Sequence, residues 1–408
     1  MPIADLWQRW REAGTPLAAV PAPLPDPAAI APREWLYGTR LIRRFVSVLA
    51  APGGAGKSAL ALGQAVALAT GRPILGETVH HTAPAWVLDL EDPPEEANRR
   101  LAACLRLHRL PEEAVRGRIF LHAGRVRRVC VAALGEGASI AFPDRDAIAG
   151  AALAEGIGLI VVDPFVKSHA LDENSNPQMD AAATAWAEVA DRTGAAVLLV
   201  HHVRKLGGGP LDVEAARGAK ALTDAARSAA LLSPMSEEEA ERLGVPRGER
   251  WRLVRLDDAK ANLAPRAEQA LWFRLATVRL GNGTARYPAG DAVQAIEAWR
   301  PPSPFADISA ADANAALDAI AAGPEPGLHF TAHKRGDGRA DRWAGRVLER
   351  YGLAEAVAGR VLAVWLKSGL LEEFEYRDPV QRRARRGLRV NDAKRPTMSG
   401  QGGHHDAE

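Results

Sequence analysis

A turn of small residues separates an apolar strand, residues 45–49, from an apolar helix that ends near Gly71. Small residues let backbone N–H groups converge on an anion, and the first turn of the helix adds its positive dipole end. Ala51 stands where such loops begin with glycine, yet three glycines remain in the turn. We therefore predict a phosphate-binding loop for ATP, in which Lys57 reaches the β- and γ-phosphates and Ser58 holds Mg²⁺. The loop residues are Pro52, Gly53, Gly54, Ala55, Gly56, Lys57, Ser58 and Ala59.

A second apolar run, residues 159–162, ends in Asp163. Four consecutive apolar residues are typical of a strand buried on both faces of a parallel sheet, and the carboxylate then emerges at the sheet edge. Asp163 is therefore predicted to be an Mg²⁺ partner beside Ser58. A capping acid after a core strand is the alternative. Pro164 follows and carries no base, so a catalytic base has to come from elsewhere.

The elements that position these residues alternate between strands and helices. Strands are expected over residues 85–90, 117–122, 125–134, 159–163, 196–201 and 251–256. Helices are expected over residues 58–70, 144–155 and from Asp92, as the cap, to about His108. Two further strands, 270–276 and 284–287, flank the turn Gly281-Asn282-Gly283 and predict a hairpin. The alternation predicts an α/β fold with a mostly parallel central sheet and flanking helices.

Glu91 is the candidate catalytic base. It stands at the end of the strand 85–90, at the edge of an open α/β sheet where ligands bind. Helix capping explains the acids after it, Asp92, Glu95 and Glu96, but it does not explain Glu91. In RecA-like P-loop ATPases the base comes from the end of such a neighbouring strand. A carboxylate there would align the attacking water with the γ-phosphate.

Five short motifs occur in an order that resembles one family. They are Val87-Leu88-Asp89-Leu90-Glu91-Asp92-Pro93, Val161-Val162-Asp163-Pro164-Phe165, Asp172-Glu173-Asn174-Ser175-Asn176, Leu198-Leu199-Val200-His201-His202 and Ala216-Arg217-Gly218-Ala219. Residues from about 33 to 285 thereby resemble the RepA-type replicative helicases of plasmids and phages. These are relatives of the DnaB-type hexameric helicases among the RecA-like ATPases. The resemblance covers neither terminus.

The resemblance implies a RecA-like core that binds ATP and Mg²⁺ between the subunits of a homo-oligomer, expected to be a hexamer. It makes Lys57 and Ser58 the phosphate and Mg²⁺ ligands, Asp163 an Mg²⁺ partner and Glu91 the water-positioning base. His202 would sense the γ-phosphate, and Arg217 would be an arginine finger for the neighbour's ATP. Lys260 would be a second cation acting across the interface. Asn262 stands where the family pattern has an arginine, which leaves more of this role to Arg217.

The segment after the expected strand 196–201 combines Arg204 and Lys205 with three glycines. Such a basic, mobile loop is suited to follow the backbone of single-stranded DNA, and RecA-like motors place DNA loops after this strand. An ordinary flexible connector would have a similar composition. The segment 172–176 is either a second channel loop or a polar turn.

The C-terminal region predicts three helices, 310–322, 342–351 and 354–368, followed by two strands around a basic turn. This is the element order of a winged helix. Residues 330–395 contain sixteen Lys and Arg against nine Asp and Glu, which suits duplex or origin DNA. A small protein-protein domain with solvated arginines is the alternative. The candidate DNA-binding residues are Arg360, Lys367, Arg382, Arg383, Arg385 and Arg386.

Composition sets the broad class. Of the 408 residues, 47% are hydrophobic and 25% charged, and the net charge is +2, as in ordinary globular proteins. The two cysteines form no metal or C-x-x-C pattern, so a reducing cytoplasm is expected, and no apolar run is long enough to span a membrane. The expected organisation is a Pro-rich arm or linker (1–30), an ATPase domain (31–295), a linker (296–308), a winged-helix-like domain (309–395) and a disordered tail (396–408).

The leading hypothesis is therefore a ring-forming DNA helicase that hydrolyses ATP at subunit interfaces and moves along single-stranded DNA during plasmid or phage replication. One alternative is a RecA-like or KaiC-like ATPase in recombination or regulation that does not unwind DNA. Another is a DNA-binding regulator that ATP switches between two states.

Overall fold

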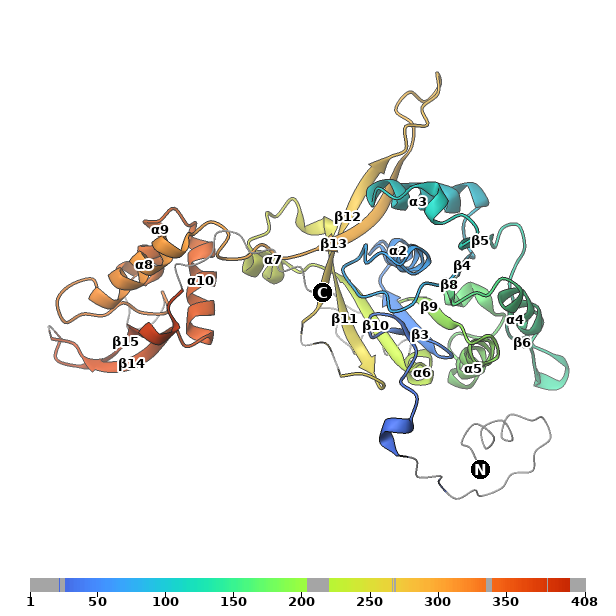
Figure 1. The fold of residues 1–408 in the computed structure, drawn as a ribbon, viewed down its shortest axis with the longest axis horizontal. Helices are drawn as coiled ribbons and strands as arrows, with labels where there is room; N and C mark the ends of the chain where they lie inside the picture. Colours follow the sequence, from blue (N-terminus) through green and yellow to red (C-terminus); the bar gives the residue numbers. More distant parts are fainter. Residues whose placement is uncertain are drawn as a thin grey trace.

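The computed structural model shows a large α/β unit and a smaller C-terminal unit (Figure 1). It describes residues 22, 26–203, 220–265, 267, 269–334, 340–379 and 381–396. In this part of the chain, none of the helices has both the length and the apolar character that a membrane crossing requires.

A nine-stranded sheet forms the centre of the large unit, in the order β13-β12-β11-β10-β3-β9-β8-β4-β5. The six strands from β10 to β5 are parallel, and β11, β12 and β13 add antiparallel pairs. The strands are β3 (Val46–Ala51), β4 (Ala85–Asp89), β5 (Ile119–Ala123), β8 (Leu159–Asp163), β9 (Ala196–His202), β10 (Ser228–Pro234), β11 (Leu253–Ala261), β12 (Leu271–Arg279) and β13 (Ala292–Trp299). The predicted α/β fold with a mostly parallel sheet is confirmed.

Helices cover both faces of this sheet (Figure 1). On one face lie α2 (Lys57–Thr70) and α3 (Pro94–Leu107), and on the other α4 (Arg145–Ala154), α5 (Asn176–Thr193) and α6 (Lys220–Ala225). Within β8, Val161 packs into the apolar core on the α2 face of the sheet and Val162 into the core on the α5 face. Successive side chains of a strand point to opposite faces. Burial on both sides explains why β8 is apolar throughout.

Several segments differ from the sequence prediction, and β10 and α5 have no counterpart in it. The partner of β12 is β13, whereas residues 284–287 lie in the loop between them, and the sheet thus continues to residue 299. That loop projects beyond α3 (Figure 1). Of residues 125–134, the last two form the short strand β6 (Ala133–Leu134), paired with β7 (Ile140–Ala141). The N-cap of α3 is Pro93 rather than Asp92.

A small N-terminal hairpin, β1 (Trp35–Tyr37) with β2 (Leu41–Ile42), is attached to the sheet through Arg40. The Arg40 guanidinium is buried and pairs with Glu77 and with the Asp258 carboxylate of β11, the latter at 3.0 Å. Desolvation of a charged group is costly unless it is paired, so this cation and its two carboxylates depend on one another.

The C-terminal unit has its own apolar core, which includes Leu317, Trp343 and Trp365. Its elements are α8 (Ala310–Ala322), α9 (Gly345–Glu349), α10 (Glu355–Lys367), β14 (Leu371–Arg377) and β15 (Ala384–Val390). The order of three helices and an antiparallel hairpin agrees with the element order expected from the sequence. Arg360 of α10 joins this unit to the large one, because its guanidinium donates to the Leu243 carbonyl at the end of α7 (Glu237–Leu243) over 2.8 Å.

Short 3₁₀ turns complete the secondary structure. They span Pro27–Ala29, Glu112–Ala114, Glu136–Ala138, Phe165–Ser168, Arg250–Arg252, Ala340–Arg342 and Asp392–Lys394.

Candidate functional site

The turn between β3 and α2 has the backbone geometry of an anion cradle. Gly54 and Gly56 adopt positive φ angles of 77° and 84°, which side-chain-bearing residues rarely tolerate. A side chain at Gly53 or Gly54 would meet no other atom within 4 Å, so the backbone there is open to a ligand. Because α2 begins at Lys57, its unpaired N–H groups and positive dipole end face the same turn.

Ser58 and Asp163 connect this cradle with the end of β8. The Ser58 hydroxyl lies close enough to the Asp163 carboxylate to act on its pKa. Burial raises the pKa of Asp163 to about 6, while the nearby Ser58 hydroxyl and the charge of Lys57 act in the opposite direction. A hydroxyl and a carboxylate that lie close together form an oxygen donor set that fits Mg²⁺.

Lys57 lies 7% exposed beside this pair. Its burial lowers the pKa of Lys57, and the carboxylates of Asp163 and Glu91 raise it. An ammonium that is partly stripped of water can bind a phosphate more strongly than a solvated one, because the lower local dielectric constant strengthens the attraction.

Glu91 and His202 complete the cluster at the carboxyl edge of the parallel strands. Glu91 lies in the turn two positions beyond β4 and is exposed. The pKa of His202 is lowered first by burial and then by Lys57, while Glu91 raises it. Lys57 is thus close enough to interact electrostatically with Asp163, Glu91 and His202, and the structure brings these four predicted residues together around it.

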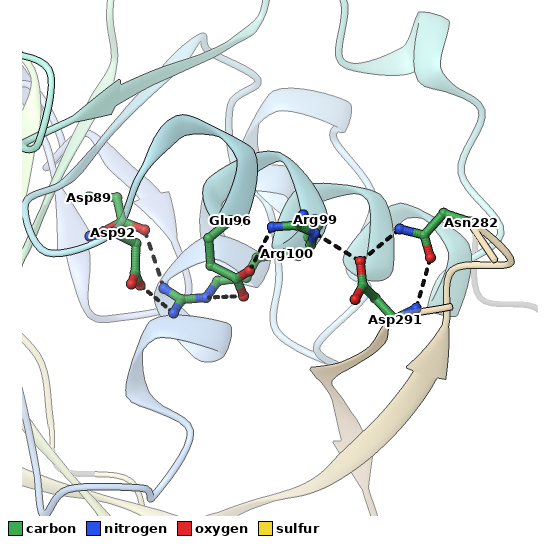
Figure 2. Close-up of polar contacts among 7 residues, drawn as sticks. All are labelled: Asp89, Asp92, Glu96, Arg99, Arg100, Asn282 and Asp291. Atoms are coloured by element: carbon green, nitrogen blue, oxygen red, sulfur yellow. Dashed lines mark hydrogen bonds and ion pairs between the residues drawn. The ribbon is translucent and has the colours of Figure 1, made fainter. Parts of the chain in front are cut away.

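Two arginines of α3 form a network next to the cradle (Figure 2). Arg100 pairs with Asp89 at 3.2 Å, with Asp92, and with Glu96 at 3.7 Å. It therefore ties the first turns of α3 to the end of β4. Its charge also acts on Lys57 and Asp163, lowering the pKa of both.

Arg99 extends the network to the loop between β12 and β13. Its guanidinium pairs with Asp291 at 2.9 Å and with Glu96 at 3.3 Å. Asn282 donates to the Asp291 carboxylate over 2.7 Å and accepts from the Asp291 backbone N–H over 2.8 Å (Figure 2). This bridge holds α3 against the start of β13.

A cleft of about 560 Å³ lies between these parts. The phosphate loop forms one wall, α3 another, and the first residues of β13 the third. The lining residues are Gly54, Gly56, Lys57, Ser58, Ala59, Glu96, Arg99, Arg100, Asp291, Ala292, Val293 and Gln294. Its size is in the range of small-molecule binding sites.

Of the residues predicted for contacts with a neighbouring subunit or with single-stranded DNA, the structure describes Lys260. Arg204, Lys205 and Arg217 lie outside the described residues. The Lys260 ammonium donates to the carbonyls of Thr223 and Asp224, at 2.9 and 2.8 Å, and so caps the C-terminal end of α6.

Two of the six basic residues proposed for DNA in the C-terminal unit are engaged inside the protein. Arg360 binds the Leu243 carbonyl, and Arg385 is buried against Asp378 and Gln381. The Arg385 side chain is buried together with Asp378, whose carboxylate would otherwise be buried without its cation. Arg360 is half-buried and donates within the protein. Lys367, Arg382, Arg383 and Arg386 are exposed.

Asp89, Arg99, Arg100 and Asp291 belong to the site but did not emerge from sequence reasoning. The spacing of Glu96 to Arg99 and Arg100 is three and four residues, a helical ion-pair signal that was present in the chain. Nothing local connects Arg99 with Asp291, since 192 positions separate them.

A nucleotide cradle on a helix N-terminus, at the carboxyl edge of a parallel sheet, defines a P-loop ATPase domain. Residues 16–208 match the family described as an AAA domain. Among solved structures, a crystal structure of the RadB recombinase is similar, with 13% sequence identity and a TM-score of 0.36 over 58% of this chain and 89% of that chain.

Proposed function

We propose that this chain is an ATP-hydrolysing DNA helicase of the RepA type, which forms a ring, expected to be a hexamer, and moves along single-stranded DNA in plasmid or phage replication. The proposed ATP hydrolysis is supported by one observation, that five predicted residues lie together at one sheet edge: Lys57, Ser58, Asp163, Glu91 and His202. The proposal places the protein in the cytoplasm.

In this proposal the phosphates of ATP occupy the cradle at Gly53 to Ser58. Lys57 binds the β- and γ-phosphate oxygens, and the nucleoside extends into the cleft between α3 and β13, since that cleft opens from the phosphate loop. Ser58 and Asp163 would hold Mg²⁺, which neutralises charge on the phosphate oxygens.

Glu91 accepts a hydrogen bond from the attacking water and aligns it with the γ-phosphate. Its exposed carboxylate near Lys57 and His202 supports this assignment. Alignment of a nucleophile is a large part of phosphoryl-transfer catalysis because the transition state offers little covalent chemistry to assist. His202 then couples the loss of the γ-phosphate to the segment that follows β9.

The neighbouring subunit contributes Arg217 and Lys260 as cations that stabilise charge on the transferred phosphoryl group. For that role, Lys260 would have to release its hydrogen bonds to the two α6 carbonyls and bind the phosphoryl group instead. The proposed DNA contacts are Arg204 and Lys205 for single strands, and a winged-helix surface with Lys367, Arg382, Arg383 and Arg386 for duplex or origin DNA.

A strand-displacement assay with ATP and Mg²⁺ tests the proposal. Wild type is expected to unwind a forked duplex, and Lys57→Ala and Arg217→Ala are each expected to lose unwinding and hydrolysis. Equal mixtures of the two variants should regain some hydrolysis, because one offers the cation and the other the intact cradle. Hydrolysis without unwinding would favour a RecA-like or KaiC-like ATPase, and slow hydrolysis with tight duplex binding would favour an ATP-switched regulator.

A further inference from the structure

Among the proposed catalytic residues, Glu91 has a side chain that few contacts hold in place. It lies outside the strand ladder, in a turn, and its carboxylate is exposed. Across the described residues, the structure records no hydrogen bond or ion pair of that carboxylate. A group that aligns a water has to be held within a fraction of an ångström, so its position must come from its backbone.

The backbone around Glu91 is held at several points. The Leu90 N–H donates to the Asp163 carbonyl over 2.8 Å, which joins this turn to the end of β8. The Asp89 carboxylate accepts the Asp92 N–H over 3.0 Å and so closes the turn from inside. These two contacts fix the residues on either side of Glu91.

Two further contacts come from the residues that follow β5. Gly124 donates its N–H to the Asp89 carbonyl over 2.7 Å. The next residue, Arg125, donates from its guanidinium Nε to the carbonyl of Glu91 itself over 2.9 Å. The loop after β5 therefore bonds to the turn both before Glu91 and at Glu91.

Close packing at Gly124 allows this arrangement. A Cβ atom at this position would lie 2.6 Å from the Leu90 carbonyl oxygen and 2.7 Å from its Cα. These are backbone atoms of the Glu91 turn, which cannot move aside like the end of a side chain. The two segments are thus in direct backbone contact, and this places the backbone of Arg125 near that of Glu91.

The geometry points to Arg125 as a positioning residue for Glu91, which acts through the Glu91 carbonyl and touches neither nucleotide nor water. This inference rests on the proposed function, in which Glu91 aligns the attacking water. Arg125 holds the peptide that precedes Asp92 in one orientation and thereby directs the Glu91 carboxylate toward the γ-phosphate. The carboxylate stays free of competing bonds, as its task requires.

The other arginines of the same loop supply a comparison. Arg127 is occupied by Asp144, at 2.7 Å. Arg128 is exposed and lies three positions after Arg125. Replacing Arg128 removes the same charge from the same loop without touching the Glu91 carbonyl, so Arg128→Ala is a matched control.

Steady-state ATP hydrolysis by the full chain with Mg²⁺ tests the inference, together with the Kd of a fluorescent ATP analogue. Arg125→Ala is expected to lower kcat roughly tenfold while KM for ATP and the Kd stay at wild-type values, because the cradle is untouched. Arg125→Lys, which keeps a donor, is expected to recover part of kcat, and Arg128→Ala is expected to match wild type. Glu91→Gln is measured beside them and is expected to abolish most hydrolysis.

The outcomes separate the inference from the proposed function. If Glu91→Gln loses hydrolysis but Arg125→Ala keeps it, the positioning role is overturned and the base assignment stands. Equal losses in Arg125→Ala and Arg128→Ala, or a change in KM or Kd with constant kcat, also overturn the positioning role. Full hydrolysis in Glu91→Gln overturns both, and a wild-type chain that hydrolyses no ATP overturns the proposed function.

Discussion

The Ser58 hydroxyl, in the first turn of α2, lies close enough to the Asp163 carboxylate at the end of β8 to lower the pKa of that carboxyl. The two residues stand more than a hundred positions apart, so they meet because β3 and β8 both flank β9 in the sheet. The chemistry of the site depends on this strand order.

Removal of the Ser58 hydroxyl is expected to affect the Mg²⁺-dependent step. Ser58→Ala should reduce ATP hydrolysis by about a hundredfold, because one ligand of the charge-neutralising ion is lost. Nucleotide binding measured in EDTA should remain near wild type, since Lys57 and the loop backbone stay in place. Ser139→Ala, which removes an exposed hydroxyl, serves as control. Equal hydrolysis by both variants would contradict the ligand role of Ser58.

The buried pairing of Arg40 is expected to matter for stability. Arg40→Ala leaves the Glu77 and Asp258 carboxylates buried without their cation, and should lower the free energy of unfolding by about 3 kcal/mol. Arg44→Ala breaks an exposed pair with Asp191 and should cost less than about 1 kcal/mol. Thermal unfolding measures both. Similar shifts in the two variants would show that burial does not set the strength of these pairs.

His169, which is buried, and His201, which is half-buried, predict a loss of stability in acid. Burial lowers the pKa of His169 and of His201 to about 4. The unfolded chain takes up these protons near pH 6.5, whereas the folded chain resists until about pH 4, so stability should fall as the pH drops between these values. A His169→Asn variant should show a shallower decline in urea-unfolding midpoint over this range. A decline as steep as that of wild type would exclude His169 as a source.

The two cysteines are expected to differ in reactivity. Cys104 is 4% exposed, and burial raises its pKa to about 12, so almost no thiolate is present at pH 8. Cys130 is half-buried and should react faster with a disulfide reagent. One thiol should therefore react in the native protein and a second after denaturation, and Cys130→Ser should remove the first. Prompt reaction of Cys104 in the native state would contradict the burial seen here.

The position of the C-terminal unit should respond to Arg360. Arg360→Ala removes the hydrogen bond to the Leu243 carbonyl and is expected to increase the radius of gyration in X-ray scattering and the rate of proteolysis between residues 300 and 308. Lys367 lies on the same helix and is exposed, so Lys367→Ala should change neither quantity. Unchanged scattering in both would mean that other contacts hold the unit.

Local sequence determined the phosphate loop and the strand that ends in Asp163. A glycine-rich turn before Lys57 and Ser58 specifies its own backbone, and four apolar residues specify a doubly buried strand, whatever surrounds them. The alanine-rich composition of residues 310–322 likewise predicted a helix, and α8 agrees with that range. In each case the residues that form the sequence pattern are the same residues that form the structural element.

Tertiary structure decided which of these parts meet. The turn at Gly281-Asn282-Gly283 predicted a hairpin with residues 284–287 as its second strand, yet β12 pairs with residues 292–299, because strand register depends on packing against α3 as well as on the turn. The bond from Arg125 to the Glu91 carbonyl and the pair between Arg99 and Asp291 arise where the ends of separate strands converge. Sequence periodicity reports which face of an element is buried, but long-range contacts depend on the order of strands in the sheet, and no local pattern encodes that order.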